Sequence, residues 1–270
     1  MIENGLHKKE TSLRRVDLQT SLVYGPVSSR RLGKSLGINP ITPGRKVCSF
    51  NCVYCQYDAE KPVWPPSEID KSLFASIRDI ESRLREELIV LSEKGNRIDY
   101  ITFAGNGEPT LHPDFPELVG MVLTVRDLLN PQAKTAVLTN GSTLVKEPIR
   151  KAVGMLDKAI VKLDAASQRS LIRVNRPYNG FELTDILNAL SELENLVVQI
   201  LLFGGTLTNA TEEDLKVLID TLNIIHPNEI QLYSLDRAPA KDGIVPIPRS
   251  ALIQIADRLR TETGLCVTVY

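Results

Sequence analysis

The chain has 270 residues, of which 43% are hydrophobic and 24% are charged, which is enough to bury the core of one barrel-sized α/β domain. Lysine and arginine (32) nearly balance aspartate and glutamate (33), which excludes the strong basic excess of a chain that coats nucleic acid. No run of eighteen apolar residues occurs, and four cysteines do not make a disulfide scaffold at this length. We therefore expect a cytoplasmic protein with no membrane partner.

Positive charge is concentrated near the start of the chain. Residues 1–57 hold nine lysines and arginines against three acidic residues, so the remainder of the chain is acidic. Five basic residues follow Asp17 before the next acidic one: Arg30, Arg31, Lys34, Arg45 and Lys46. Two interpretations of this run stay open, a solvated basic face and a site that attracts an anionic substrate such as a phosphate.

Short apolar segments alternate with longer amphipathic ones from residue 98 onward, a rhythm typical of βα units around a parallel sheet. The predicted strands are residues 35–41, 98–103, 135–138, 159–163, 197–202 and 229–233, with a seventh at 266–269.

The helices between these strands are predicted from caps and apolar spacing. The first runs from a Ser67 cap to Gly95, with leucine and isoleucine recurring at helical intervals. Pro113 is expected in the first turn of the next helix. Thr211 and Asp214 approximate a capping box before a later helix, and residues 249–261 form the last one.

Six βα repeats predict an α/β fold, specifically a partial (β/α)6 barrel of the TIM-like type with N-terminal and C-terminal extensions. No linker or internal repeat is visible, so we expect a single domain over residues 1–270. Its core spans about residues 22–240, a basic extension covers 1–21, and a helix and a strand occupy 241–270.

Polar or glycine-rich turns follow each of the six predicted strands. They are the cysteine-bearing loop at 48–55 and the turns at 105–110, 139–141, 164, 204–205 and 234–239. Because the carboxyl ends of parallel strands meet on one face of such a fold, we expect the active site there.

Three cysteines, Cys48, Cys52 and Cys55, fall within eight residues at C-x3-C-x2-C spacing. Three ligands are one short of a closed set, so a metal centre built on them keeps an open coordination position. Zinc prefers four protein ligands and paired C-x2-C knuckles, so an iron–sulfur cluster is favoured and structural zinc is the alternative. Cys266 is expected to be a small buried residue of the last strand.

The segment CSFNCVYC, with Tyr54 directly before the third cysteine, resembles the signature of the radical S-adenosylmethionine (radical SAM) superfamily. YGPVSSRRLGKSLGINP at 24–40 and DRAP at 236–239 resemble a short, single-domain branch of it, distantly like the tRNA wyosine-synthesis enzymes. That branch more often reads YGPVPSRR, so Ser28 departs from its pattern. The similarity covers about residues 22–240.

The resemblance implies an iron–sulfur enzyme in which Cys48, Cys52 and Cys55 hold three irons of a [4Fe–4S] cluster. S-adenosylmethionine chelates the fourth iron and is cleaved reductively to methionine and a 5′-deoxyadenosyl radical. The radical then removes a hydrogen atom from an unidentified substrate. An electron donor such as flavodoxin or ferredoxin is implied as a partner.

The resemblance also assigns cofactor-binding residues. Tyr54 matches an aromatic position near the adenine, and the turn Gly105-Asn106-Gly107-Glu108-Pro109 resembles the GGEP motif that binds the methionine ammonium group. Asn140 is assigned to the ribose or carboxylate, with an ordinary Asn-Gly turn as the alternative. Lys162 and Asp164 end the fourth predicted strand on one face and are expected to line the cavity, with a solvated surface position as the alternative for Lys162.

Further residues are assigned less specific roles. Ser234 and Arg237 are expected to contact substrate, with a structural ion pair as the alternative for Arg237. His112 is expected to end a turn without binding metal, and Trp64 to anchor a lid.

Three functional alternatives stay open. The leading one is a radical SAM enzyme acting on an unidentified substrate, for which a nucleic acid or nucleotide is one option. The second is an activating enzyme that installs a glycyl radical on a partner protein. The third is a non-enzymatic iron–sulfur electron carrier or redox sensor.

Overall fold

The computed structural model describes residues 17–57, 62–63, 69–239 and 241–270. Its main feature is an eight-stranded sheet in the order β1-β2-β3-β4-β5-β6-β8-β10. These strands are β1 (Val23–Ser29), β2 (Gly33–Ile38), β3 (Tyr100–Phe103), β4 (Lys134–Thr139), β5 (Lys158–Lys162), β6 (Leu196–Leu201), β8 (Glu229–Tyr233) and β10 (Val267–Val269).

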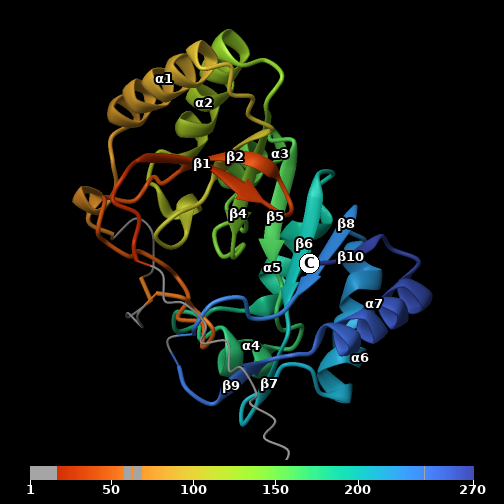
Figure 1. Cartoon of the computed structure of the whole chain (residues 1–270). Coiled ribbons are helices and arrows are strands. Elements are labelled where there is room, and N and C mark those ends of the chain that lie inside the picture. The colour runs from red at the N-terminus through yellow and green to blue at the C-terminus, as the bar shows by residue number, and fades with distance from the viewer. Residues whose placement is uncertain (1–16, 58–61, 64–68, 240) are drawn as a thin grey trace, which may run out of the picture.

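All neighbouring strands from β2 to β10 pair in parallel, whereas β1 pairs with β2 in the antiparallel sense. The order ends at β1 and β10, so the described strands form an open, curved sheet and not a closed barrel. This arrangement confirms the predicted partial TIM-like barrel (Figure 1).

Helices connect most of the parallel strands. They are α1 (Ile77–Glu93), α2 (Phe115–Leu129), α3 (Glu147–Gly154), α4 (Gln168–Val174), α5 (Leu183–Ser191), α6 (Glu212–Ile225) and α7 (Arg249–Thr263). Two short 3-10 turns, η2 (Lys71–Leu73) and η3 (Pro109–Leu111), precede α1 and α2, and a small antiparallel pair is formed by β7 (Phe203–Gly205) and β9 (Ile244–Pro246). In Figure 1, α1 and α2 lie near one end of the curved sheet and α6 and α7 near the other.

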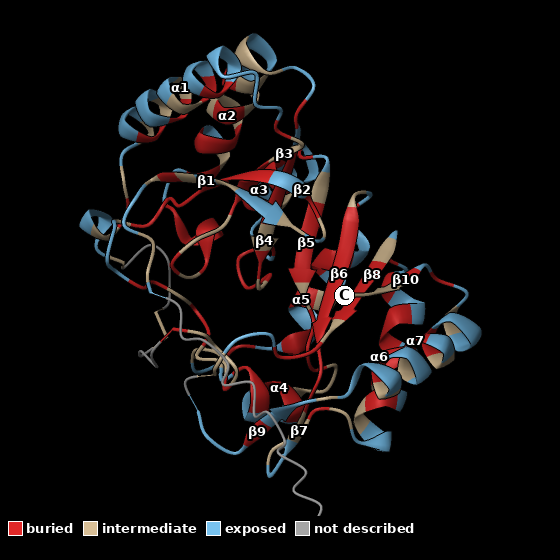
Figure 2. Ribbon diagram, in the orientation of Figure 1, coloured by how far each residue is buried: buried red, intermediate tan, exposed pale blue. Residues whose placement is uncertain are grey.

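The two faces of the sheet differ in chemistry. One face packs aliphatic side chains such as Leu36, Ile101 and Val198 into the large core that it shares with the helices. Figure 2 shows this buried interior. The opposite face holds a smaller apolar cluster, and Lys162 and Gln199 sit opposite each other on it in the strand register. Because successive residues of a strand alternate between faces, this second face carries the polar side chains that the sheet surrounds.

Several boundaries differ from the sequence-based expectation. Ser67 and Trp64 lie outside the described residues, and the side chain of Ser76 caps α1 by accepting from the Asp79 backbone N–H. Pro116 lies in the first turn of α2, whereas Pro113 precedes the helix. The Thr211 cap of α6 is confirmed.

The expected burial of Cys266 is wrong. Cys266 is exposed and not buried, because it lies one residue before β10 begins. Within the described ranges, no helix combines the length and the apolar content that crossing a membrane requires.

Candidate iron–sulfur and cofactor site

The three clustered cysteines lie on the loop that follows β2, and each is partly exposed. Backbone hydrogen bonds attach this loop to the end of α4: Val53 N–H donates to the Val174 carbonyl (2.9 Å) and Asn51 N–H to the Asn175 carbonyl (3.1 Å). Within the loop, Cys55 N–H donates to the Cys52 carbonyl (3.1 Å). Cysteines far from β5 in the chain are thereby held beside its carboxyl end.

The donor set suits a cluster better than a single ion. No three or more His, Cys, Asp or Glu side chains converge to hold one metal ion in the part of the chain that the structure describes. In a [4Fe–4S] cluster each protein sulfur binds a different iron, so such convergence is not required. Three soft thiolates without a carboxylate or imidazole among them are typical iron–sulfur ligands.

Two asparagine amides point at the sulfurs. Asn140 Nδ2 lies 3.7 Å from Cys48 Sγ, and Asn175 Nδ2 lies 3.4 Å from Cys52 Sγ. Donors of this kind stabilise sulfur that carries negative charge, as it does when bound to iron. Asn175 was not predicted as a site residue, because it follows a helix and its sequence neighbourhood carries no motif.

Burial raises the pKa of two of the clustered thiols, those of Cys48 and Cys52. The pKa of Cys48 is well above its ordinary value, because burial and then the nearby Cys52 and Glu108 disfavour the thiolate. Burial raises the pKa of Cys52 to about 11, although hydrogen bonds from Asn175 and Tyr54 oppose the shift. Iron binding must therefore displace protons from these sulfurs.

The turn after β3 packs directly against the residue before Cys48. Val47 N–H donates to the Asn106 carbonyl (3.1 Å), and Glu108 N–H donates to the Val47 carbonyl (2.9 Å). Gly107 has a φ of +144°, and a Cβ there would lie 1.9 Å from the Val47 carbonyl oxygen. Only glycine allows the two backbones to approach so closely.

The carboxylate of Glu108 is buried and joins this turn to the end of β4. Its Oε1 accepts hydrogen bonds from Thr110 N–H (3.1 Å), Thr110 Oγ1 (2.6 Å) and Thr139 Oγ1 (2.6 Å). Its Oε2 accepts from Asn140 N–H (2.6 Å), which leaves Oε2 with the greater capacity for another donor. Burial raises the pKa of Glu108, and these hydrogen bonds oppose the shift.

The other residues of the turn have structural partners. Asn106 is fully buried, and its side chain pairs with the backbone of Gln19 through Oδ1 (2.7 Å) and Nδ2 (2.8 Å). A Cβ on Gly105 would lie 2.4 Å from Asn39 Oδ1, and Pro109 starts η3. Asn106 therefore anchors the segment before β1 and does not face the cysteines.

Tyr54, Lys162 and Asp164 form one connected group. The Tyr54 hydroxyl donates to Asp164 Oδ2, and Lys162 Nζ lies 2.9 Å from Asp164 Oδ1. Lys162 Nζ also donates to the Tyr233 hydroxyl (2.8 Å). Burial disfavours the ammonium, but Asp164 and Tyr233 outweigh it and raise the pKa of Lys162. The ion pair that the structure places here connects the cysteine loop to the ends of β5 and β8.

The residues expected at the end of β8 hold the loop around them. Ser234 Oγ donates to the Leu202 carbonyl (2.6 Å) and accepts from Ile247 N–H (2.8 Å), so its hydroxyl is already paired. Arg237 donates to Gln56 Oε1, one residue after Cys55, and Arg30 forms an ion pair with Asp236. His112 ends η3, which agrees with the turn end predicted for it, and its ring forms hydrogen bonds with the backbone groups of Ala75 and Asp114.

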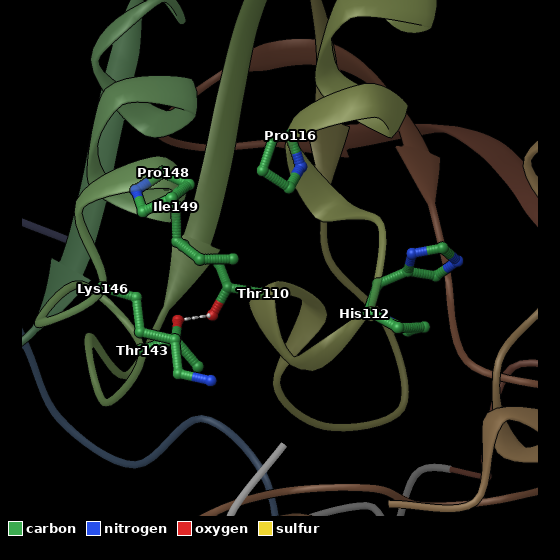
Figure 3. Close-up of a pocket in the computed structure, with 8 residues that line it drawn as sticks. Thr110, His112, Pro116, Thr143, Lys146, Pro148 and Ile149 are labelled. Carbon is green, nitrogen blue, oxygen red and sulfur yellow. Dashed lines mark hydrogen bonds between the residues drawn. The ribbon is translucent and has the colours of Figure 1, made fainter. Parts of the chain in front are cut away.

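A separate cavity of about 420 Å³ is lined by Thr110, whose hydroxyl donates to Glu108 (Figure 3). Thr110 and Thr143 are hydrogen-bonded to each other in its wall, and none of the three cysteines lines it. Its walls are Thr110, His112, Pro113, Pro116, Thr143, Lys146, Pro148 and Ile149. We assign it no part in cofactor binding.

Comparison with known proteins identifies the class. The sequence profile of the Radical SAM superfamily matches residues 44–222. The chain therefore belongs to the radical SAM superfamily, whose enzymes use a [4Fe–4S] cluster and S-adenosylmethionine. More narrowly, it belongs with the UPF0026 proteins: it is 31% identical over 253 residues to one from Helicobacter pylori, covering 92% of this chain and 76% of that protein.

A second relative is much longer than this chain. It is named GTPase Obg, from Brachyspira hyodysenteriae, and is 31% identical over 230 residues, which cover 83% of this chain but 31% of that protein.

Solved structures support the fold. A radical SAM methyltransferase from Sphaerobacter thermophilus superposes with a TM-score of 0.64 at 15% identity, over 87% of this chain and 65% of that one. TYW1 with a lysine-pyruvate adduct superposes with a TM-score of 0.57 at 15% identity, over 84% and 73%. Both superpositions show that this chain shares its fold with these proteins.

Proposed function

We propose that this protein binds a [4Fe–4S] cluster through Cys48, Cys52 and Cys55 and cleaves S-adenosylmethionine reductively to initiate a radical reaction on a substrate with an anionic group. When bound, the cluster supplies the electron that splits S-adenosylmethionine into methionine and a 5′-deoxyadenosyl radical. The observation that carries the proposal is the attachment of the cysteine loop to both neighbouring turns. Val47, next to Cys48, forms a bridge with Gly107, and the Asn140 amide contacts Cys48 Sγ. Superfamily membership supports the reaction class.

The side chains around the cysteines have distinct tasks in this proposal. Asn140 and Asn175 donate to the sulfurs of Cys48 and Cys52 and so favour their negatively charged, iron-bound form. Glu108 Oε2 offers an acceptor to the ammonium group of the methionine moiety, and three donors fix the other oxygen in place.

Tyr54, Lys162 and Asp164 form the wall of the cofactor site toward β5 and β8. Asp164 neutralises Lys162, so the wall is polar without an excess charge next to the sulfonium. The ring of Tyr54 lies beside Phe203, with centroids 6.0 Å apart, and supplies an apolar surface for the adenine.

Partners and setting follow from the same chemistry. Radical SAM enzymes need a reductant, and we propose a flavodoxin or ferredoxin. The four cysteines form no disulfide. Because unpaired thiols stay reduced in the cytoplasm, we propose that the protein is cytoplasmic.

Anaerobic reconstitution with iron and sulfide tests the proposal. We expect about four irons per chain, and we expect 5′-deoxyadenosine to form from S-adenosylmethionine under dithionite. Cys52→Ala should lose both, whereas Cys266→Ala, which changes an exposed cysteine outside the cluster loop, should keep both. Stoichiometric zinc without visible absorption, or equal losses in the two variants, would contradict it.

A further inference from the structure

Two neighbouring arginines at the tip of the β1–β2 hairpin have different surroundings. Ser29 Oγ accepts from the backbone N–H groups of Arg31 (3.2 Å) and Leu32 (3.1 Å), which fixes the turn. Arg30 is exposed and pairs with Asp236. Arg31 instead lies over the ring of Tyr233, with its guanidinium carbon 4.1 Å from the ring centroid. The turn therefore directs the two adjacent cations to different partners: Arg30 pairs with a carboxylate, and Arg31 stacks on an aromatic ring.

The guanidinium of Arg31 has an unused hydrogen-bonding edge. Its Nε and Nη2 atoms are buried, and neither donates to any group among the described residues. A second ring, that of Tyr270, lies 5.0 Å from the guanidinium carbon. The aromatic rings stabilise the charge through their faces, but they provide no acceptor in the plane of the guanidinium.

Burying two nitrogens of a guanidinium without an anionic partner costs free energy, and this cost points to a partner that binds there. The nearby acids are already engaged: Asp236 with Arg30, and Asp164 with Lys162. Burial is also the largest effect on Arg31 and lowers its pKa. Within the described part of the chain, Arg31 forms no ion pair of its own.

The two unpaired nitrogens define the shape of the missing partner. Nε and Nη2 lie on the same edge of the guanidinium, and their N–H groups are parallel. That geometry matches two oxygens of one carboxylate or one phosphate. One carbonyl oxygen can accept from both donors, as that of Val267 does from Arg260, but only an oxyanion also supplies negative charge and a separate oxygen for each N–H.

We propose that Arg31 binds an oxyanion of the substrate, a carboxylate or a phosphate, through Nε and Nη2. The inference rests on the proposed function, because it needs a substrate on the polar face of the sheet. A continuous set of contacts supports this placement: Tyr54 with Asp164, Asp164 with Lys162, and Lys162 with Tyr233. Arg31 lies on the ring of that tyrosine, one residue beyond the proposed cofactor wall.

The surroundings of Arg31 on this face of the sheet are polar. Lys162 Nζ lies 4.7 Å from the centroid of the same Tyr233 ring, so two cations share one aromatic side chain. Gln199 and Gln231 hydrogen-bond to each other nearby (3.1 Å) where a closed barrel would carry branched aliphatic residues. Nε and Nη2 are buried although Arg31 is partly exposed as a whole residue, so the proposal requires the side chain to rotate for an anion to bind.

Anion binding to the reconstituted protein tests the inference separately from catalysis. Equilibrium dialysis with radiolabelled inorganic phosphate, and in a second arm with radiolabelled glutarate, measures binding to wild type, Arg31→Gln and Arg30→Gln. Arg30→Gln is a matched control. It removes the same charge from the adjacent arginine, which is exposed and already paired with Asp236. Circular dichroism verifies that each variant is folded.

We expect at least one anion to bind wild type and Arg30→Gln saturably, and Arg31→Gln to lose about tenfold to hundredfold in affinity. Arg31→Lys keeps the charge but loses the two parallel N–H donors, so its anion affinity should be intermediate. It replaces Arg31→Gln if that variant does not fold. Binding of phosphate alone indicates a phosphorylated substrate, and binding of glutarate alone a carboxylated one.

No saturable binding of either anion to wild type would overturn the inference, as would equal binding by wild type and the Arg31 variants. S-adenosylmethionine cleavage without substrate should not change in the control variant Arg30→Gln, whose arginine is exposed and paired with Asp236. Wild-type protein that cleaves S-adenosylmethionine but binds neither anion would mean that the inference alone fails. Wild-type protein that binds an anion but does not cleave S-adenosylmethionine would mean that the proposed function fails.

Discussion

The Val47 carbonyl and Gly107 are in direct backbone contact: a parallel bridge joins the two residues, and a Cβ on Gly107 would lie 1.9 Å from the Val47 oxygen. Val47 precedes the first cysteine, and Gly107 lies in the turn after β3. The position of the cysteine loop relative to the sheet therefore depends on the absence of one side chain.

Gly107→Ala should displace this loop. Backbone strain at a φ of +144° and overpacking against Val47 should together cost roughly 2–6 kcal/mol of unfolding free energy. Urea denaturation measures the loss, and iron content after reconstitution should fall with it. Gly44→Ala is the matched control, because Gly44 has a φ of +74° with nothing within 4 Å of its Cβ, so only about 1–2 kcal/mol is expected. Equal losses would contradict the close-contact argument.

Asn175→Leu should impair the bound cluster without preventing its assembly. The variant keeps the volume but removes the amide that lies 3.4 Å from Cys52 Sγ. We expect a more negative reduction potential and a rate of S-adenosylmethionine cleavage about tenfold to hundredfold lower. Redox titration followed by EPR measures the first, and chromatography of 5′-deoxyadenosine the second. Asn188→Ala, at an exposed position of α5, is the control. An unchanged potential in Asn175→Leu would contradict the assigned role.

Asp164→Asn should destabilise the fold strongly. It leaves the Lys162 ammonium without its carboxylate, although an amide oxygen still accepts from Leu201 N–H. Loss of one partner of a buried pair typically costs about 3–5 kcal/mol. Glu229→Gln is the comparison, because it breaks the Lys158–Glu229 pair, whose side chains are 28% and 20% exposed, and should cost less. A larger loss in Glu229→Gln would be inconsistent with the buried pair.

The free energy of unfolding should decrease as the pH is lowered, because His112 is buried in its neutral form. Its Nδ1 accepts from Asp114 N–H, so Nε2 carries the proton and donates to the Ala75 carbonyl (2.9 Å). Burial lowers the pKa of His112 below its ordinary 6.5, so the unfolded chain binds more protons than the native one near and below that pH. The contribution is therefore present above pH 6.5 and is lost as the pH drops through this region.

Urea midpoints between pH 5.5 and 7.5 measure this effect. We expect a steeper loss of stability on acidification in wild type than in His112→Gln, whatever the absolute stability of the variant. His226 is exposed and is common to both proteins. Parallel pH profiles would exclude His112 as the responsible group.

The regular part of the fold was predictable because each parallel strand is a short apolar run that ends in a turn. The predicted strand at 229–233 agrees with β8 residue for residue, and the other parallel strands differ at their ends. β1 was missed, since Gly25 and Pro26 interrupt its pattern, and β7 and β9 have three residues each, too few for any period to show. Helix starts were misplaced where several caps compete, as with Ser76.

The candidate site was only partly predictable. The cysteines and the turn after β3 carry a local pattern, but Asn175 and Tyr233 reach the site from elements far away in the chain. Arg30 and Arg31 look alike in the sequence, and only their contacts separate the paired arginine from the one with an unused edge.

The central claim is that three cysteines leave one iron free for S-adenosylmethionine. EPR of the anaerobically reconstituted, dithionite-reduced protein, recorded before and after S-adenosylmethionine is added, tests it most directly. We predict that the g values of the reduced cluster shift, because the added molecule coordinates the iron that no cysteine occupies. A spectrum that S-adenosylmethionine leaves unchanged would contradict the claim.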